Sequence, residues 1–213
     1  MQFEELKNRL SKISNLPLPG ERAQHLMAPT ERVRTVSEMD IESKNPRWAG
    51  VIALFYPSKN NKAMLVLILR KTYKGVHSNQ VGFPGGRWEE EDNDMEATAR
   101  RETEEEVGVE RGDITIVKKM TKLYIPPSNF WVQPFIGLVD YTPTFIPEEA
   151  EVETILEVRV ADFLNKENLI SKKVATSYEV KLDVPAFLLN DQVVWGATAM
   201  MLSEIRELLT QNG

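Results

Sequence analysis

The fold of this chain is best predicted from residues 81–109, VGFPGGRWEEEDNDMEATARRETEEEVGV. This stretch begins with a stiff turn, FPGG, and continues through an acidic loop. Its second half, Met95–Val107, has the composition of a helix, and Gly108 follows at the position where a helix C-terminus favours glycine. The ordered combination of turn, acidic loop and helix is much more specific than a run of charges.

Three glutamates of the predicted helix, Glu102, Glu105 and Glu106, stand at positions i, i+3 and i+4. This spacing places their carboxylates on one helix face, within about one turn of each other. Like charges placed in this way weaken a helix, and a hard divalent cation with oxygen ligands reverses that cost. Arg101 lies four residues before Glu105, where it can hold and orient that carboxylate. The plainer alternative is a solvated acidic helix face.

The segment resembles the Nudix box, G-x5-E-x7-R-E-U-x-E-E-x-G-U, in which U is an aliphatic residue. The matching residues are Gly86, Arg101, Glu102, Glu105, Glu106, Gly108 and Val109. Three departures are visible: the gap from Gly86 to Arg101 is one residue longer, Asp92 replaces the first glutamate, and Thr103 occupies an aliphatic position. The longer loop with an aspartate is similar to that of the coenzyme A pyrophosphatase branch of the family.

A motif that lies upstream of the box in this branch is half present. It has the form L-L-T-x-R-[SA]-x3-R-x3-G-x3-F-P-G-G, and Arg70 and the turn Phe83–Gly86 match it at the right spacing. Gly75 replaces its second arginine, and Asn79 replaces its internal glycine. Two later segments also resemble the branch: residues 123–130 and residues 194–200.

The resemblance implies a site that binds Mg²⁺ or Mn²⁺. Glu102 and Glu106 are expected as primary metal ligands, and Glu105 as a further ligand or the general base. Arg101 is expected to orient the carboxylates, and the carbonyl of Gly85 to face the metal. Members of the family differ in which glutamate serves as the base, so Glu102 is an alternative for that role.

The resemblance also implies hydrolysis of a diphosphate linkage, with coenzyme A or an acyl derivative as the small-molecule substrate. The products would be 3′,5′-ADP and a phosphopantetheine. Arg70, Lys74 and Phe83 are the expected substrate-binding residues. Lys71 is a further cation for a substrate phosphate, unless these lysines are simply solvated.

The sequence is also compatible with two other functions. One is hydrolysis of a different nucleoside diphosphate derivative, such as ADP-ribose. The other is a Nudix-fold module that senses a nucleotide without cleaving it, although such a module would be expected to have lost glutamates of the box. Glu151 and Glu153 belong to an acidic run that supplies either an additional ligand or base, or only a solvated loop.

The bulk composition is that of a soluble globular protein with 213 residues, 42% of them hydrophobic and 27% charged. A net charge of −6 argues against non-specific binding of nucleic acid. The absence of cysteine excludes disulfides and thiolate metal sites, and it is compatible with the cytoplasm. No run is apolar enough to span a membrane, and the first residues do not have the pattern of a signal peptide.

The periodicity of the rest predicts an α+β fold. The expected helices are residues 3–14, 21–27, 161–164 and 197–209, and the expected strands are 48–56, 63–70, 113–120, 130–140, 153–160 and 176–184, followed by 185–189 and 193–195. The resemblance implies one Nudix-like α/β/α sandwich with a mixed sheet, in which the helix 95–107 lies between sheets. Its core is expected at 46–165, after an N-terminal helical extension (1–45) and before C-terminal strands and a helix (166–213). Residues 30–46 are expected as a polar lead-in, with a possible role as an arm in a homodimer.

Overall fold

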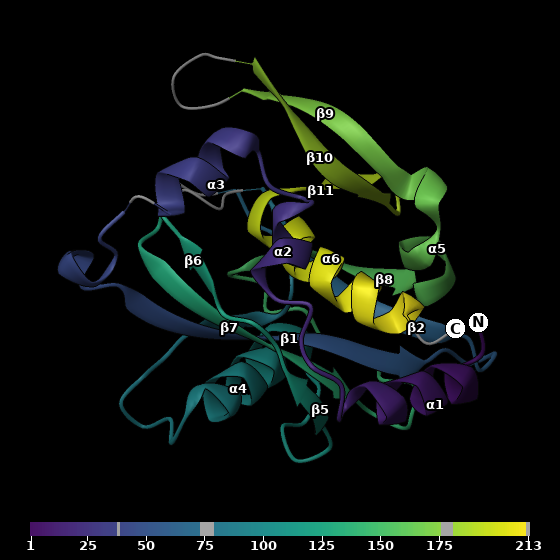
Figure 1. Ribbon diagram of the computed structural model, residues 1–213. Coiled ribbons are helices and arrows are strands. Elements are labelled where there is room, and N and C mark those ends of the chain that lie inside the picture. Colours follow the sequence, from purple (N-terminus) through teal and green to yellow (C-terminus); the bar gives the residue numbers. More distant parts are fainter. Residues whose placement is uncertain (38, 73–78, 176–180, 212–213) are drawn as a thin grey trace.

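The structure is a computed structural model that describes residues 1–37, 39–72, 79–175 and 181–211 (Figure 1). Most strands of these ranges form one mixed sheet with the central order β3-β2-β1-β7-β5. Its strands are β1 (Arg47–Pro57), β2 (Ala63–Arg70), β3 (Val81–Gly82), β4 (Gly85–Arg87), β5 (Thr115–Lys119), β6 (Leu123–Ile125), β7 (Phe130–Leu138) and β8 (Val152–Arg159). The sheet is mixed because β1 pairs with β2 in antiparallel and with β7 in parallel orientation.

A second, antiparallel sheet has the order β11-β10-β9. Its strands are β9 (Leu169–Ala175), β10 (Lys181–Leu189) and β11 (Gln192–Val194). The helices are α1 (Phe3–Ile13), α2 (Glu21–His25), α3 (Thr30–Ser37), α4 (Met95–Val107), α5 (Val160–Leu164) and α6 (Gly196–Thr210), with short 3₁₀ turns η1 (Glu42–Lys44) and η2 (Lys166–Asn168). This arrangement confirms the α+β class with a mixed sheet.

Both faces of the main sheet are covered, because successive side chains of a strand point to opposite sides. In β1, Val51, Ala53 and Phe55 join the hydrophobic cluster that contains the apolar faces of α1 and α6. Ile52 and Leu54 join the cluster on the other face, where α4 packs. Figure 1 shows α4 on one side of the sheet and α6 on the other.

The position of α4 differs from the expectation that it lies between two sheets. The strands against which it packs, β1, β4 and β7, belong to the same sheet. The helix that adjoins the second sheet is α6, which contacts β10 and shares a hydrophobic cluster with residues of β2 and β10. The second sheet lies over α6 in Figure 1. The Nudix-box helix therefore packs on the main sheet, and its residues Glu102 and Glu106 face β4 of that sheet.

Two further elements differ from the sequence prediction. The polar lead-in at 30–46 contains α3 and η1, whereas no regular structure was predicted there. The strand expected at 176–184 falls partly on residues outside the described ranges, and β10 continues to Leu189. Strand β10 pairs with β9. The sequence analysis did not predict β9, because Lys172 and Lys173 interrupt the alternation of apolar and polar residues in that segment. No helix of the described residues is long and apolar enough to cross a membrane.

The N-terminal helix is part of the hydrophobic core. Phe3, Leu6, Leu10 and Ile13 of α1 are buried, as their helical spacing predicts. Arg9 also donates a hydrogen bond of 3.1 Å from Nη1 to the carbonyl of Leu209 in α6. The first helix and the last are thus joined on one face of the main sheet.

Gly50 brings α4 directly onto β1. A Cβ atom at Gly50 would lie 2.4 Å from the carbonyl oxygen of Met95 and 3.0 Å from the amide nitrogen of Ala99. The helix begins with Asp94, whose carboxylate accepts a hydrogen bond from Ala97 N–H at 2.8 Å, and it ends at Gly108 with a left-handed φ of 73°. The first turns of the helix therefore lie directly on β1, and both ends of the helix are capped.

Candidate active site

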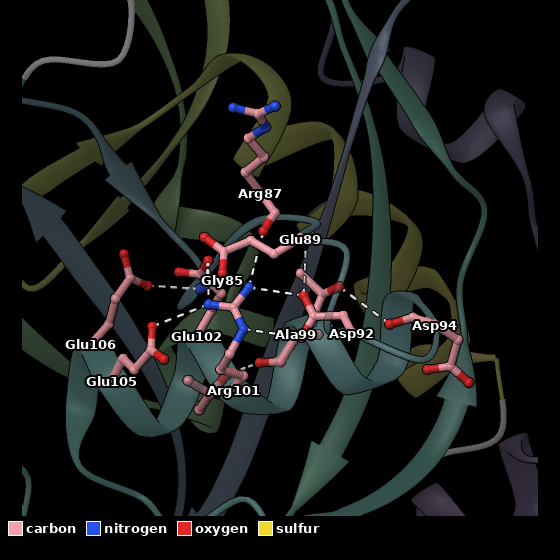
Figure 2. Close-up of polar contacts among 12 residues, drawn as sticks. Gly85, Arg87, Glu89, Asp92, Asp94, Ala99, Arg101, Glu102, Glu105 and Glu106 are labelled. Carbon is pink, nitrogen blue, oxygen red and sulfur yellow. Dashed lines mark hydrogen bonds and ion pairs between the residues drawn. The ribbon is translucent and has the colours of Figure 1, made fainter.

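Three carboxylates project from α4 toward the turn that contains Gly85 (Figure 2). Their side chains differ in exposure: Glu106 is 3% exposed, Glu102 14% and Glu105 52%. The i, i+3, i+4 spacing thus produces a graded row of carboxylates, from the interior to the surface. A solvated acidic face, the plainer alternative, does not describe Glu102 and Glu106, which are largely buried.

Arg101 holds this row in place through several contacts (Figure 2). Its Nη1 lies 3.0 Å from Glu102 Oε1 and 3.1 Å from Glu105 Oε2, which confirms the expected contact with Glu105. Its Nη2 also donates to the carbonyl of Arg87 at 3.1 Å. The hydrogen bond with Asp92, and after it the charge of Glu102, raise the pKa of the Arg101 guanidinium.

Asp92 closes the acidic loop onto the helix. It accepts two hydrogen bonds from Arg101, Nε to Oδ1 at 3.0 Å and Nη2 to Oδ2 at 2.9 Å, in a bidentate pair. The hydrogen bond with Arg101 lowers the pKa of Asp92 to about 2. The indole Nε1 of Trp88 donates to the Asp92 carbonyl at 3.2 Å. The sequence analysis identified Asp92 only as a difference from the Nudix box and did not predict its ion pair with Arg101.

Glu106 is the most buried carboxylate of the row. Its Oε2 accepts a hydrogen bond of 2.7 Å from Gly85 N–H. Its Oε1 lies 3.2 Å from Arg70 Nη1, but this oxygen accepts no hydrogen bond from the described residues. Burial raises the pKa of Glu106 to about 7 against the lowering effect of Arg70, and burial also raises the pKa of Glu102.

Arg70 reaches from β2 into the carboxylate cluster. Besides its ion pair with Glu106, its Nη2 donates to the carbonyl of Gly85 at 2.8 Å. The guanidinium therefore bridges the carboxylate and the carbonyl that the family resemblance assigns to the metal. Arg70, expected only as a substrate-binding residue, serves as the counter-charge of Glu106 in this structure.

The two glycines of the turn leave room for different neighbours. Gly85 has a φ of +143°, and a Cβ atom there would lie 2.4 Å from the carbonyl oxygen of Gly50. A Cβ atom on Gly86 would lie 2.3 Å from the carboxylate carbon of Glu102. Gly85 thus permits the backbone path, and Gly86 makes space for a functional carboxylate.

The donor set of the cluster fits a hard divalent ion. Glu102, Glu106 and the Gly85 carbonyl supply oxygen atoms, and Glu106 Oε1 is buried without a hydrogen-bond donor. Within the described ranges no three acidic or histidine side chains converge into a ready-made metal cage. The positive charges near these oxygens are instead those of Arg70 and Arg101. An ion at this site would take its remaining ligands from substrate phosphates and water, as Mg²⁺ usually does.

A loop that precedes β8 adds negative charge at the buried end of the cluster. The amide of Glu148 donates to the backbone carbonyl of Glu106 at 3.1 Å. The charge of Glu151 contributes to raising the pKa of both Glu102 and Glu106. Glu153 is an exposed residue of β8. The structure therefore favours Glu151 over Glu153 as the residue of this acidic run that influences the site.

A cavity of about 350 Å³ begins at the Gly85–Gly86 turn. Its apolar walls are formed by Val51, Phe83, Ile125, Phe130, Trp195 and Met201. Three arginines, Arg32, Arg70 and Arg87, also line it. Of the residues predicted to bind substrate, Phe83 and Arg70 line this cavity, and Lys74 lies outside the described residues. Arg32 was not identified from the sequence, because it belongs to the unrecognised helix α3.

Comparison with known proteins identifies the family. Residues 46–178 match the model of the NUDIX domain. "Nudix hydrolase 22, chloroplastic" of Arabidopsis thaliana is 31% identical over 165 residues, which cover 74% of this chain and 53% of that protein. "Peroxisomal coenzyme A diphosphatase ndx-8" of Caenorhabditis elegans is 30% identical over 135 residues, covering 63% of this chain and 58% of that protein. The chain therefore spans little more than half the length of these curated relatives.

Solved structures agree with this fold. A Nudix hydrolase from M. Smegmatis superposes with a TM-score of 0.53 at 12% sequence identity, covering 79% of this chain and 88% of that one. Nudix hydrolases generally use divalent metal ions, which suits the oxygen donors of α4. With its glutamate row, its glycine turn and the family match over most of its length, this chain belongs to the Nudix family.

Proposed function

We propose that the chain is a metal-dependent hydrolase that cleaves the diphosphate linkage of a nucleoside diphosphate derivative, with coenzyme A or an acyl-coenzyme A as substrate. The observation that carries this proposal is the convergence of Glu102 and Glu106 on the Gly85–Gly86 turn, beside a cavity of about 350 Å³. A pair of largely buried carboxylates next to a substrate-sized cavity suits phosphoryl chemistry, which depends mostly on positioning and electrostatics.

Glu102, Glu106 and the Gly85 carbonyl would hold Mg²⁺ or Mn²⁺. When bound, the ion neutralises charge on the diphosphate and lowers the pKa of a water molecule. Arg101 keeps Glu102 and Glu105 in position through its Nη1 contacts. Glu105, the most exposed of the three, has the access to water that a general base needs, and Glu102 is the alternative base.

Coenzyme A is supported by two observations. The segments 123–130 and 194–200, which resemble the coenzyme A branch, line the same cavity through Ile125, Phe130 and Trp195. Their apolar surfaces suit a pantetheine arm or an acyl chain. In addition, a relative at 30% identity is named as a coenzyme A diphosphatase.

The test is a substrate panel with Mg²⁺ and Mn²⁺ and identification of products by mass. We expect coenzyme A to give 3′,5′-ADP and 4′-phosphopantetheine, and no turnover in the presence of EDTA. Efficient hydrolysis of ADP-ribose with coenzyme A left intact would contradict the substrate but not the reaction. Nucleotide binding without turnover of any member of the panel would instead indicate a sensor.

A further inference from the structure

The cavity beside the glutamate row contains three arginines with different surroundings. Arg70 is occupied by Glu106 and the Gly85 carbonyl. Arg87 is exposed, and Figure 2 shows its side chain extending away from the carboxylates. Arg32 is half-buried and comes from α3, outside the region that matches the family model.

Arg32 is a half-buried cation for which the described part of the chain provides no acidic partner. Its Nη2 donates to the carbonyl of Tyr124 at 2.8 Å, and among the described residues it forms no ion pair. It lines the cavity at the Gly85–Gly86 turn and also a cavity of about 170 Å³ that Tyr124 and Trp131 line, so Arg32 borders both. Burial lowers the pKa of this guanidinium. A buried charge without a counter-charge is unfavourable, and an anionic ligand would compensate it.

We propose that Arg32 binds a phosphate monoester of the substrate that is separate from the cleaved diphosphate, namely the 3′-phosphate of coenzyme A. This inference rests on the proposed function. A guanidinium presents a planar fork of donors that matches phosphate geometry, and the hydrogen bond of Nη2 to Tyr124 uses only part of that fork. The ligand would enter through the cavity that the Gly85–Gly86 turn also lines.

The cations expected from the sequence are less suited to this role. Arg70 neutralises Glu106. Lys71 is not among the described residues that line the cavity, and its backbone N–H donates to the Glu151 carbonyl at 2.8 Å. Lys74 lies outside the described residues. Arg32, rather than these lysines, is therefore the cation that we expect to distinguish coenzyme A from dephospho-coenzyme A, which lacks the 3′-phosphate.

The experiment compares kcat/KM for coenzyme A and dephospho-coenzyme A in the wild type and in three variants. In Arg32→Met the preference for coenzyme A should fall by at least about tenfold, the scale of one charge-assisted hydrogen bond, through a higher KM for coenzyme A alone. Arg32→Lys should retain part of the preference. Arg22→Met is the neutral control, because Arg22 pairs with Glu207 on the surface. Thermal unfolding of each variant checks that the Tyr124 contact is not required for folding.

A binding measurement keeps the inference separate from the proposed function. Calorimetry should show that the wild type binds 3′,5′-ADP at least about tenfold more tightly than AMP, and that Arg32→Met removes this difference. The inference is overturned if the wild type shows no difference, if Arg32→Met weakens both ligands equally, or if Arg87→Met removes the preference instead. If the wild type cleaves neither substrate, the proposed function fails, and the calorimetric ratio still decides the role of Arg32.

Discussion

Gly86 lies directly against the carboxylate of Glu102, so a side chain at position 86 would occupy the space of that carboxylate. Because an added Cβ atom would lie 2.3 Å from the Glu102 carboxylate, Gly86→Ala must displace that carboxylate. The displaced group is the end of a flexible side chain, so we expect little change in melting temperature but a fall in kcat of about a hundredfold, the scale of an ångström-sized misplacement. Steady-state kinetics and thermal unfolding measure the two effects.

Gly85→Ala is the matched comparison. Its Cβ atom would meet the backbone of β1, and its φ of +143° is unfavourable for any residue with a side chain. We therefore expect a lower melting temperature in this variant as well as lower activity. Wild-type rates in both alanine variants would mean that the two glycines only form a turn and have no role in activity.

Removing a carboxylate of the buried pair should abolish most of the activity. Glu102→Gln and Glu106→Gln should each lower kcat by at least about a hundredfold, the scale of losing a general base or an electrostatic stabiliser. Glu104→Gln is the control, since Glu104 is on the same helix and pairs with Arg111. Near-normal turnover of Glu106→Gln at saturating Mg²⁺ would show that Glu106 is not a metal ligand.

Burial of Glu106 makes the stability of the metal-free protein depend on pH. Its folded-state pKa of about 7 is above its ordinary value of 4.5, so the folded state binds the proton more tightly. The stability that this tighter proton binding adds to the folded state is fully present below pH 4.5 and is lost as the pH rises through about 7. Each pKa unit corresponds to about 1.4 kcal/mol. Relative to the wild type, Glu106→Gln should therefore be more stable at pH 8 than at pH 5.

Urea unfolding in EDTA at the two pH values measures this difference. Comparing the variant with the wild type at each pH removes the contributions of other titrating groups. An equal difference in free energy of unfolding at pH 5 and pH 8 would mean that the pKa of Glu106 is not raised.

Local spacing was enough to predict some of these residues but not others. The contact of Arg101 with Glu105 follows from a separation of four residues in a helix. The pairs of Arg101 with Asp92 and of Arg70 with Glu106 join a loop or a strand to the helix, and no local rule specifies them. The position of Arg32 at the cavity is still harder to predict from the sequence, because it depends on how α3 packs against Tyr124.

The contact between α4 and β1 is a property of two elements. It depends on Gly50, where a Cβ atom would lie 2.4 Å from the Met95 carbonyl in the helix backbone. Since neither backbone can easily move, Gly50→Ala should lower the free energy of unfolding by about 1–3 kcal/mol, the usual cost of overpacking. It should also lower kcat, because the helix that carries the glutamates must shift.

Urea unfolding and steady-state kinetics test this prediction together. Gly112→Ala is the matched control, because no atom lies within 4 Å of the added Cβ. If Gly50→Ala unfolds like the Gly112 variant, the close approach of helix and strand contributes little to stability.

The elements predicted best are those with end signals as well as periodicity. Helix α4 has the bounds expected from the sequence, because Asp94 caps its start and Gly108 its end. Helix α3 was missed because Val33 and Val36 give too little apolar periodicity for a segment of eight residues. Such an element forms through its tertiary contacts rather than its own propensity. The resemblance correctly gave the fold class but placed α4 between sheets, which its packing contradicts.

The hydrophobic core of the molecule extends beyond the segment that matches the family model. A fragment of residues 46–178 lacks α1 and α6, whose apolar faces cover Phe55, Leu65 and Leu67 of the main sheet. We expect this fragment to lose cooperative unfolding, because that sheet face would be exposed to water. Circular dichroism during urea unfolding, with the 213-residue chain as control, measures it. A cooperative transition in the fragment would show that the terminal helices are accessory.

The tryptophans of the chain are distributed in a useful way. Trp195 lines the cavity, and Trp88 binds the Asp92 carbonyl in the acidic loop. Trp48 and Trp131 stack with ring centroids 6.2 Å apart, and the backbone N–H of Trp88 donates to the Trp48 carbonyl at 3.0 Å. Because indole fluorescence follows the polarity around the ring, Trp195 reports ligand entry and Trp88 reports the state of the loop. The molecule thus carries one indole in the wall of its cavity and another in the acidic loop that precedes α4.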